Sequence, residues 1–203
     1  MKLAIKIALP LVIIVLCYLV YDSIAGKIRF EKETKHRRDL VIERLKDIRL
    51  AQLAYKSVKG KYAGDFRSLL DFVKNDSFPV IKALGTVPDT LTEGDAVRMG
   101  LVTRDTIYVN VKDSLFSSNY LKYHLSPFLI TSLPYIPFGK GEKFVMQAGE
   151  IEKGKVIVNV FEVFAKYEFI YTGLDTQNES IDLGDGLKVG SMNEPSTSGN
   201  WGE

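Results

Sequence analysis

The sequence has little of the chemistry that enzymes and metal sites commonly use. It contains one cysteine, Cys17, and two histidines, His36 and His124, among 203 residues. A single cysteine excludes a disulfide within the chain and a thiolate metal cluster. A zinc site would need carboxylates as most of its ligands, and no group of acidic residues has a suitable spacing. We therefore expect neither a metal ion nor a cofactor.

Motifs for catalysis are missing as well. The stretch GDGLKVG at residues 184–190 fits neither the dinucleotide fingerprint nor the P-loop, and it is interpreted as a glycine-rich turn into a strand. No G-x-S-x-G elbow is present, and the acids near Asp182 and Asp185 do not follow the EF-hand order. His124 lies among aromatics in NYLKYHLSPF and is predicted to be a packed or surface residue. The sequence thus predicts no catalytic residue and no enzyme, and leaves catalysis by carboxylates alone as an open alternative.

The N-terminus carries a long apolar run. Residues 7–21 have no charge, and extending the run to residues 3–26 adds only Lys6 and Asp22. About 20 apolar residues span the ~30 Å hydrocarbon core of a bilayer. We interpret residues 1–26 as a transmembrane signal anchor, which makes membrane lipid a partner. Ser23-Ile24-Ala25 also offers small residues for a signal peptidase, so a cleaved signal peptide is the alternative. Leu16 precedes Cys17 and argues against lipidation there.

Charge is distributed unevenly along the chain. Residues 27–61 hold twelve Lys/Arg against five Asp/Glu, whereas residues 62–203 hold thirteen against nineteen. A basic stalk of this kind can face lipid headgroups or nucleic acid. We expect a solvated helix beside the membrane and no nucleic-acid partner.

The orientation has two interpretations. Six basic residues between 27 and 38 outnumber Lys2 and Lys6, which by the positive-inside rule favours a cytoplasmic body. N-terminal anchors that export a long C-terminal part are the commoner bacterial arrangement. We expect a single-pass inner-membrane protein with a periplasmic body.

A helical stalk is predicted for residues 27–60, because residues 27–59 contain neither proline nor glycine. From about residue 40 the helix carries an apolar stripe at helical spacing, which should dock on another part of the molecule. The stripe consists of Val41, Leu45, Ile48, Gln52 and Tyr55, widened by Ala51, Ala54 and Val58. We select Val41, Leu45, Ile48 and Tyr55 as candidate interaction residues.

An α+β body is predicted for residues 61–190, followed by a flexible tail at residues 191–203. Short helices are expected at residues 65–74 and 92–99, and Pro79 and Pro88 should lie in a loop. Strands are expected at residues 106–111, 144–152, 155–164, 167–172 and 187–189, with a hairpin turn at residues 152–154 and an irregular segment at residues 126–142. The predicted fold class is therefore α+β: a transmembrane helix continuing into a long amphipathic helix, then a small antiparallel sheet of about four strands with short helices.

Two resemblances accompany these patterns. An apolar N-terminus running into DIRLAQLAYKSVKGKYAGDFRSLL, with a glycine–tyrosine turn at Gly60-Lys61-Tyr62, resembles type IV pilins and pseudopilins over about the first seventy residues. That resemblance implies a helix that leaves the membrane and packs on a small antiparallel sheet. The glycine, Phe-Thr-Leu and glutamate of the prepilin peptidase signature are absent, so it does not extend to cleavage, methylation or filament assembly.

The second resemblance covers nearly the whole chain. The stretches RLKDIRLAQLAYKSVKGKYAGDF, SFPVIKALGTVPDTLTEGDAVRMGLVTRDTI and GLKVGS resemble a family of single-pass Gram-negative envelope membrane proteins without an assigned activity. The sequence therefore predicts a membrane-anchored, non-enzymatic envelope protein, a structural or assembly component that binds other envelope proteins or itself. The alternatives are a pseudopilin-like filament subunit and an envelope module that binds a ligand such as calcium or a glycan.

Overall fold

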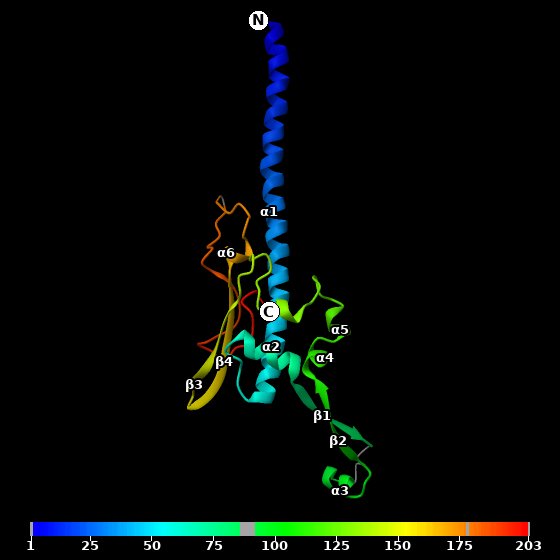
Figure 1. Cartoon of the computed structure of the whole chain (residues 1–203). Coiled ribbons are helices and arrows are strands. Elements are labelled where there is room, and N and C mark those ends of the chain that lie inside the picture. Colours follow the sequence, from blue (N-terminus) through cyan, green and yellow to red (C-terminus); the bar gives the residue numbers. More distant parts are fainter. Residues whose placement is uncertain (1, 86–91, 178, 203) are drawn as a thin grey trace.

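One helix organises the whole molecule. The structure, a computed structural model, describes residues 2–85, 92–177 and 179–202. Helix α1 (Lys2–Lys59) is unbroken over 58 residues, which at 1.5 Å per residue is about 87 Å. It ends at Lys59 and is followed by Gly60, whose φ of +75° suits a residue without a Cβ atom. Figure 1 shows its N-terminal half standing clear of the body, and its C-terminal half surrounded by it.

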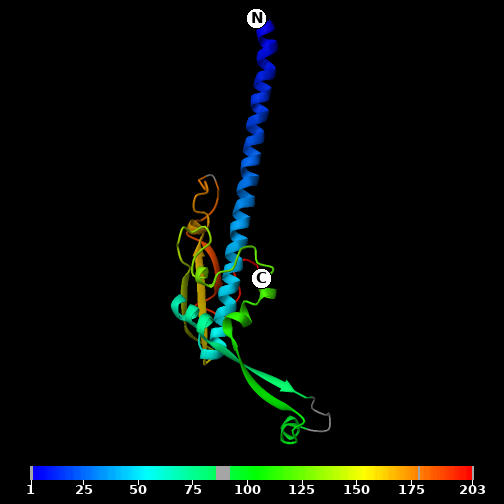
Figure 2. The same ribbon diagram turned by 45° about the vertical axis from the view of Figure 1, so that its right-hand side comes forward.

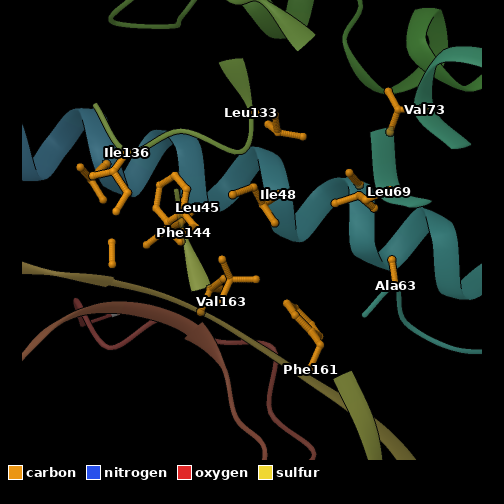
Figure 3. Packing of buried hydrophobic residues seen from close by; sticks show 14 of the residues in the cluster. Leu45, Ile48, Ala63, Leu69, Val73, Leu133, Ile136, Phe144, Phe161 and Val163 are labelled. Carbon is orange, nitrogen blue, oxygen red and sulfur yellow. The ribbon is translucent and has the colours of Figure 1, made fainter. Parts of the chain in front are cut away.

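The body forms around the predicted apolar stripe of α1. Helix α2 (Phe66–Asn75) follows the turn, and Asp65 caps it by accepting a hydrogen bond from the Ser68 amide at 2.9 Å. A three-stranded antiparallel sheet in the order β3-β4-β5 lies against α1; it comprises β3 (Val145–Lys153), β4 (Val156–Lys166) and β5 (Gly186–Gly190). Figure 3 shows Leu45 and Ile48 of α1 facing Phe144, Phe161 and Val163 across this interface. The fold class predicted from the sequence, α+β, is confirmed.

The hairpin between β3 and β4 is confirmed with a two-residue turn. Val145 pairs with Phe164 and Lys153 with Val156, leaving Gly154 and Lys155 as the turn. Their φ values are +59° and +65°, which a type I′ turn requires at both central positions.

A second sheet is separate from the first, so the prediction of a single sheet of about four strands is wrong. It contains β1 (Ser77–Leu84) and β2 (Thr103–Asn110), paired antiparallel from Ser77–Asn110 to Leu84–Thr103. We call these strands, together with helix α3 (Glu93–Arg98), the arm. Figures 1 and 2 show it projecting from the end of the body that is distant from the N-terminus.

Pro79 belongs to strand β1, not to the predicted loop. Proline lacks a backbone N–H and is tolerated at the edge of a sheet, and a two-stranded ribbon consists only of edges. Pro88 lies outside the described residues. The short helix expected at residues 92–99 is confirmed as α3, with the Asp95 amide donating to Thr92 Oγ1 at 3.3 Å.

The strand predicted at residues 167–172 is a helical turn, α6 (Tyr167–Ile170). Its aromatic and β-branched residues are typical of a strand, but β4 ends just before them and the chain turns away. The Tyr171 amide donates to the Tyr167 carbonyl at 2.8 Å, and the Tyr167 amide donates to the Asp185 carbonyl at 2.8 Å. Tertiary contacts with the loop before β5 therefore override the local β preference.

The C-terminal segment is attached to the body, which corrects the predicted flexible tail. The Gly190 amide donates to the Ser198 carbonyl at 3.0 Å, and the Asn200 side chain bonds both the Lys188 amide and the Gly186 carbonyl, at 2.9 and 2.8 Å. Trp201 packs against the core. The segment covers the outer edge of β5 and uses side-chain bonds that its Ser-, Gly- and Asn-rich composition did not indicate.

Three short helices complete the body. They are α4 (Val111–Leu115), α5 (Ser118–Leu121) and the 3₁₀ turn η1 (Ile130–Ser132), within a mostly irregular stretch. Leu133 and Ile136 follow η1 and close the core over α1 (Figure 3).

Candidate functional site

The four candidate interaction residues lie in the core of the body. Val41, Leu45 and Ile48 are fully buried, and Tyr55 is half-buried with its ring 5.1 Å from that of Phe72. These side chains hold the body onto α1. A partner could contact the three buried ones only if the body came off the helix.

A polar cluster lies beside them in the C-terminal quarter of α1. Asp47 is 1% exposed, and its Oδ1 accepts a hydrogen bond from the Tyr120 hydroxyl at 2.9 Å. His124 Nε2 lies 3.0 and 3.2 Å from the two carboxylate oxygens, and its side chain is 8% exposed. The histidine ring packs edge-on against the rings of Tyr120 and Phe128. His124 is thus a packed residue, as the sequence indicated.

Burial sets the electrostatics of this cluster. Desolvation raises the pKa of Asp47, against the opposing effect of the hydrogen bonds from His124 and Tyr120 and of the nearby charge of Arg44. Desolvation and the adjacent Asp47 carboxylate raise the pKa of the Tyr120 hydroxyl above its usual value, so it stays a neutral donor. Burial lowers the pKa of Arg44, whose Nη1 donates to Ser132 Oγ.

A second carboxylate supports the same attachment. Glu43, one helical turn before Asp47, accepts hydrogen bonds from the Leu125 amide at 2.6 Å and the Ser126 hydroxyl at 3.4 Å. We call residues 117–128 the strap, because Asp47 and Glu43 together bind it to α1. A general base must reach a substrate proton, whereas Asp47 is enclosed and engaged by the strap. The arrangement is that of a clamp between two parts of the chain.

A groove of about 720 Å³ lies where the body begins along α1. Phe30, Lys35 and Arg38 line it from the helix, and the wall opposite includes Tyr167, Tyr171, Asp182, Asp185 and Trp201. Next to it, Arg37 donates to the Thr172 carbonyl at 2.9 Å and forms an ion pair with Glu33 at 2.8 Å, which fixes α6 against α1.

Two acids of this groove bond backbone amides close to them in the chain. Asp182 Oδ1 accepts from the Gly184 amide at 2.8 Å, and Asp185 Oδ1 accepts from the Gly186 amide at 2.7 Å. The first bond reaches two residues along the chain, as in an Asx turn, and the second reaches the next residue. Over residues 2–85, 92–177 and 179–202, no group of three or more His, Cys, Asp or Glu residues could hold a metal ion.

The N-terminal half of α1 is the other candidate site. The large apolar side chains between residues 9 and 28 are exposed, and none of the most apolar window is buried inside the molecule. Helix Leu9–Lys59 is long and apolar enough to cross a membrane or to act as a signal anchor.

Comparisons with known proteins found no family model that matches the chain and neither a curated protein nor a solved structure with significant similarity. The two family resemblances therefore stay predictions.

Sequence reasoning missed the clamp, although one signal was present. Asp47 stands four residues before Ala51, which widens the apolar stripe, so the helical period places its carboxylate on the buried face. Its partners, Tyr120 and His124, are more than seventy residues away along the chain. No local pattern could have indicated that contact.

Proposed function

We propose that this chain is a membrane-anchored, non-enzymatic envelope protein that acts as a structural or assembly component of a protein complex. One observation carries the proposal: the exposed apolar run and the centre of the body core are parts of the same uninterrupted helix. An anchor built this way fixes the height and orientation of the body relative to the bilayer, which is what a scaffold needs.

The distribution of charge supports the same function. Basic residues dominate α1 just beyond the apolar run, where Lys27, Arg29 and Lys32 are exposed and can meet anionic headgroups. The strap is held on α1 by the clamp at Asp47 and Glu43, and both carboxylates accept hydrogen bonds from it. The partners would be membrane lipid and other envelope proteins or a second copy of the chain.

We place the body in the periplasm, anchored in the inner membrane. Cells that produce the chain with a C-terminal tag are fractionated, the membranes are washed with alkaline carbonate, and spheroplasts are treated with protease. We expect the tagged chain in the washed membranes and loss of the tag in spheroplasts but not in intact cells. A tag that survives in intact spheroplasts would place the body in the cytoplasm, and full-length chain in the carbonate supernatant would exclude the anchor.

A pseudopilin-like filament subunit is the second candidate. The packing of the C-terminal half of α1 on the antiparallel sheet β3-β4-β5 favours it. A ligand-binding envelope module is the third, and the aromatic groove near Trp201 favours it. Filaments sheared from cells would support the second, and a shift in melting temperature with calcium or an envelope glycan would support the third.

A further inference from the structure

Phe78, near the base of the arm, packs against the core of the body, whereas the part of the arm around Ile107 and Tyr108 is exposed on both faces. Successive residues in a strand point to opposite faces of a sheet. Ile107 and Tyr108 of β2 are nevertheless both exposed, at 41% and 72%. At its base the arm is tied by the Val111 amide, which donates to the Asp76 carbonyl at 3.0 Å. An isolated two-stranded ribbon is marginally stable in water and gains stability from a third strand.

Strand β2 is the better pairing edge of the arm. Strand β1 contains Pro79, which cannot donate a backbone hydrogen bond, whereas Thr103–Asn110 contains neither proline nor glycine. Among the strands that the structure describes, β2 pairs only with β1. Its outer edge is therefore eight residues, about 26 Å, long, and about every second residue directs its backbone N–H and C=O away from β1 toward that edge.

The three-stranded sheet has one matching edge. Strand β5 is covered on its outer side by the C-terminal segment, through the bridge between Val189 and Gly199. Strand β3 pairs only with β4 in the described part of the chain. Beside it, the β3–β4 hairpin exposes Val156 and Ile157 at 61% and 69%.

The directions of the two edges fit an antiparallel pair between two copies. Strand β2 runs from the tip of the arm back to the buried Val111, whereas β3 runs from the buried Phe144 out to the exposed turn at Gly154. Figures 1 and 2 show the three-stranded sheet alongside α1 and the arm on the opposite side, extending past the C-terminal end of α1 from about the level of the β3–β4 hairpin turn. A half-turn about an axis parallel to α1 therefore brings the arm of one copy to the side occupied by the sheet of the other.

We propose that two copies of this chain form a two-fold dimer in which β2 of each copy adds antiparallel to β3 of the other. Each sheet then becomes five-stranded, in the order β5-β4-β3 followed by β2 and β1 of the second copy. This inference rests on the proposed function, because membrane anchoring keeps both α1 helices parallel, as the two-fold axis requires. Anchoring also raises the effective concentration of the second copy, which lets a small interface suffice.

Disulfide crosslinking in native membranes tests the pairing. In a Cys17→Ser background, one tagged copy carries Tyr108→Cys, and a differently tagged copy carries cysteine at Gln147, Glu150 or Glu152, which are exposed positions of β3. We expect one of the three to crosslink at least about fivefold more than Asp175→Cys, an exposed control position near α6.

Moving the first cysteine from Tyr108 to Thr106 should move the best partner two residues toward the hairpin turn, because the strands are antiparallel. Three results would each overturn the proposal. All three β3 positions could crosslink only as much as the control, the best partner could move away from the hairpin turn, or the dominant disulfide could join the cysteines at position 108 of two copies. The fractionation described above separates the two claims. A chain retained in the membrane without the crosslink contradicts only the dimer, and a crosslinked chain in the soluble fraction contradicts only the anchor.

Discussion

Gln52 locks the turn between α1 and α2, and replacing it with leucine should destabilise the body strongly. The side chain is fully buried and pairs with both backbone groups of Ala63, accepting from the amide at 2.9 Å and donating to the carbonyl at 2.8 Å. Gln52→Leu keeps the volume roughly but leaves both groups unpaired where water cannot enter. At about 1–3 kcal/mol for each unsatisfied group, offset in part by the apolar leucine, we expect a loss of about 2–4 kcal/mol.

Urea unfolding of the full chain in detergent measures this loss, with fluorescence of Trp201, the single tryptophan, as the probe. Gln177→Leu is the matched control, because Gln177 is exposed and its substitution should stay within about 0.5 kcal/mol. Gln52→Glu keeps the acceptor but loses the donor, so its deficit should shrink at acidic pH, where a protonated carboxyl can donate. A Gln52→Leu protein as stable as the control would refute the claim that Gln52 stabilises the turn through its hydrogen bonds to Ala63.

Three further predictions follow from the core and the clamp. Ile48→Asp places a charge at a fully buried position and should cost more than about 4 kcal/mol in the same urea assay, whereas unchanged melting would contradict the packing. Burial raises the pKa of Asp47 in the folded state, so the free energy of unfolding should fall as pH rises from about 3.8 through that raised pKa. This pH dependence should vanish in Asp47→Asn, and the same dependence in both proteins would contradict the raised pKa of Asp47. Asn200→Ala removes two side-chain hydrogen bonds to β5, and we expect faster proteolysis of the C-terminal segment, with equal cleavage rates as the contrary result.

The sequence predicts those parts of the fold that depend on residues close together in the chain. The apolar stripe on α1, the cap at Asp65 and the glycine turn of the hairpin are local patterns. The cap is found where it was predicted, the stripe is buried or half-buried except for Val58, and the hairpin turn lies at residues 154–155, not at the predicted 152–154. The helical turn at Tyr167 and the attached C-terminal segment depend on contacts between distant parts of the chain. Residue type alone cannot indicate such contacts.

For the candidate sites, too, the sequence indicates local features and not the contacts between distant residues. The exposed apolar half of α1 was evident from composition, because a run of this length has few structural alternatives. The candidate interaction residues pack in the core of the body of the same chain, and their role in binding a partner stays a prediction. A stripe gives the position of a buried face and no information about what covers it.

The intact mass of the chain purified from washed membranes tests most directly that a single helix is both anchor and core. We predict a mass that retains residues 1–25, close to the 22.8 kDa of the full sequence. A chain shortened by those residues and recovered in the soluble fraction would contradict the account, because the apolar run would then be a signal peptide that is removed.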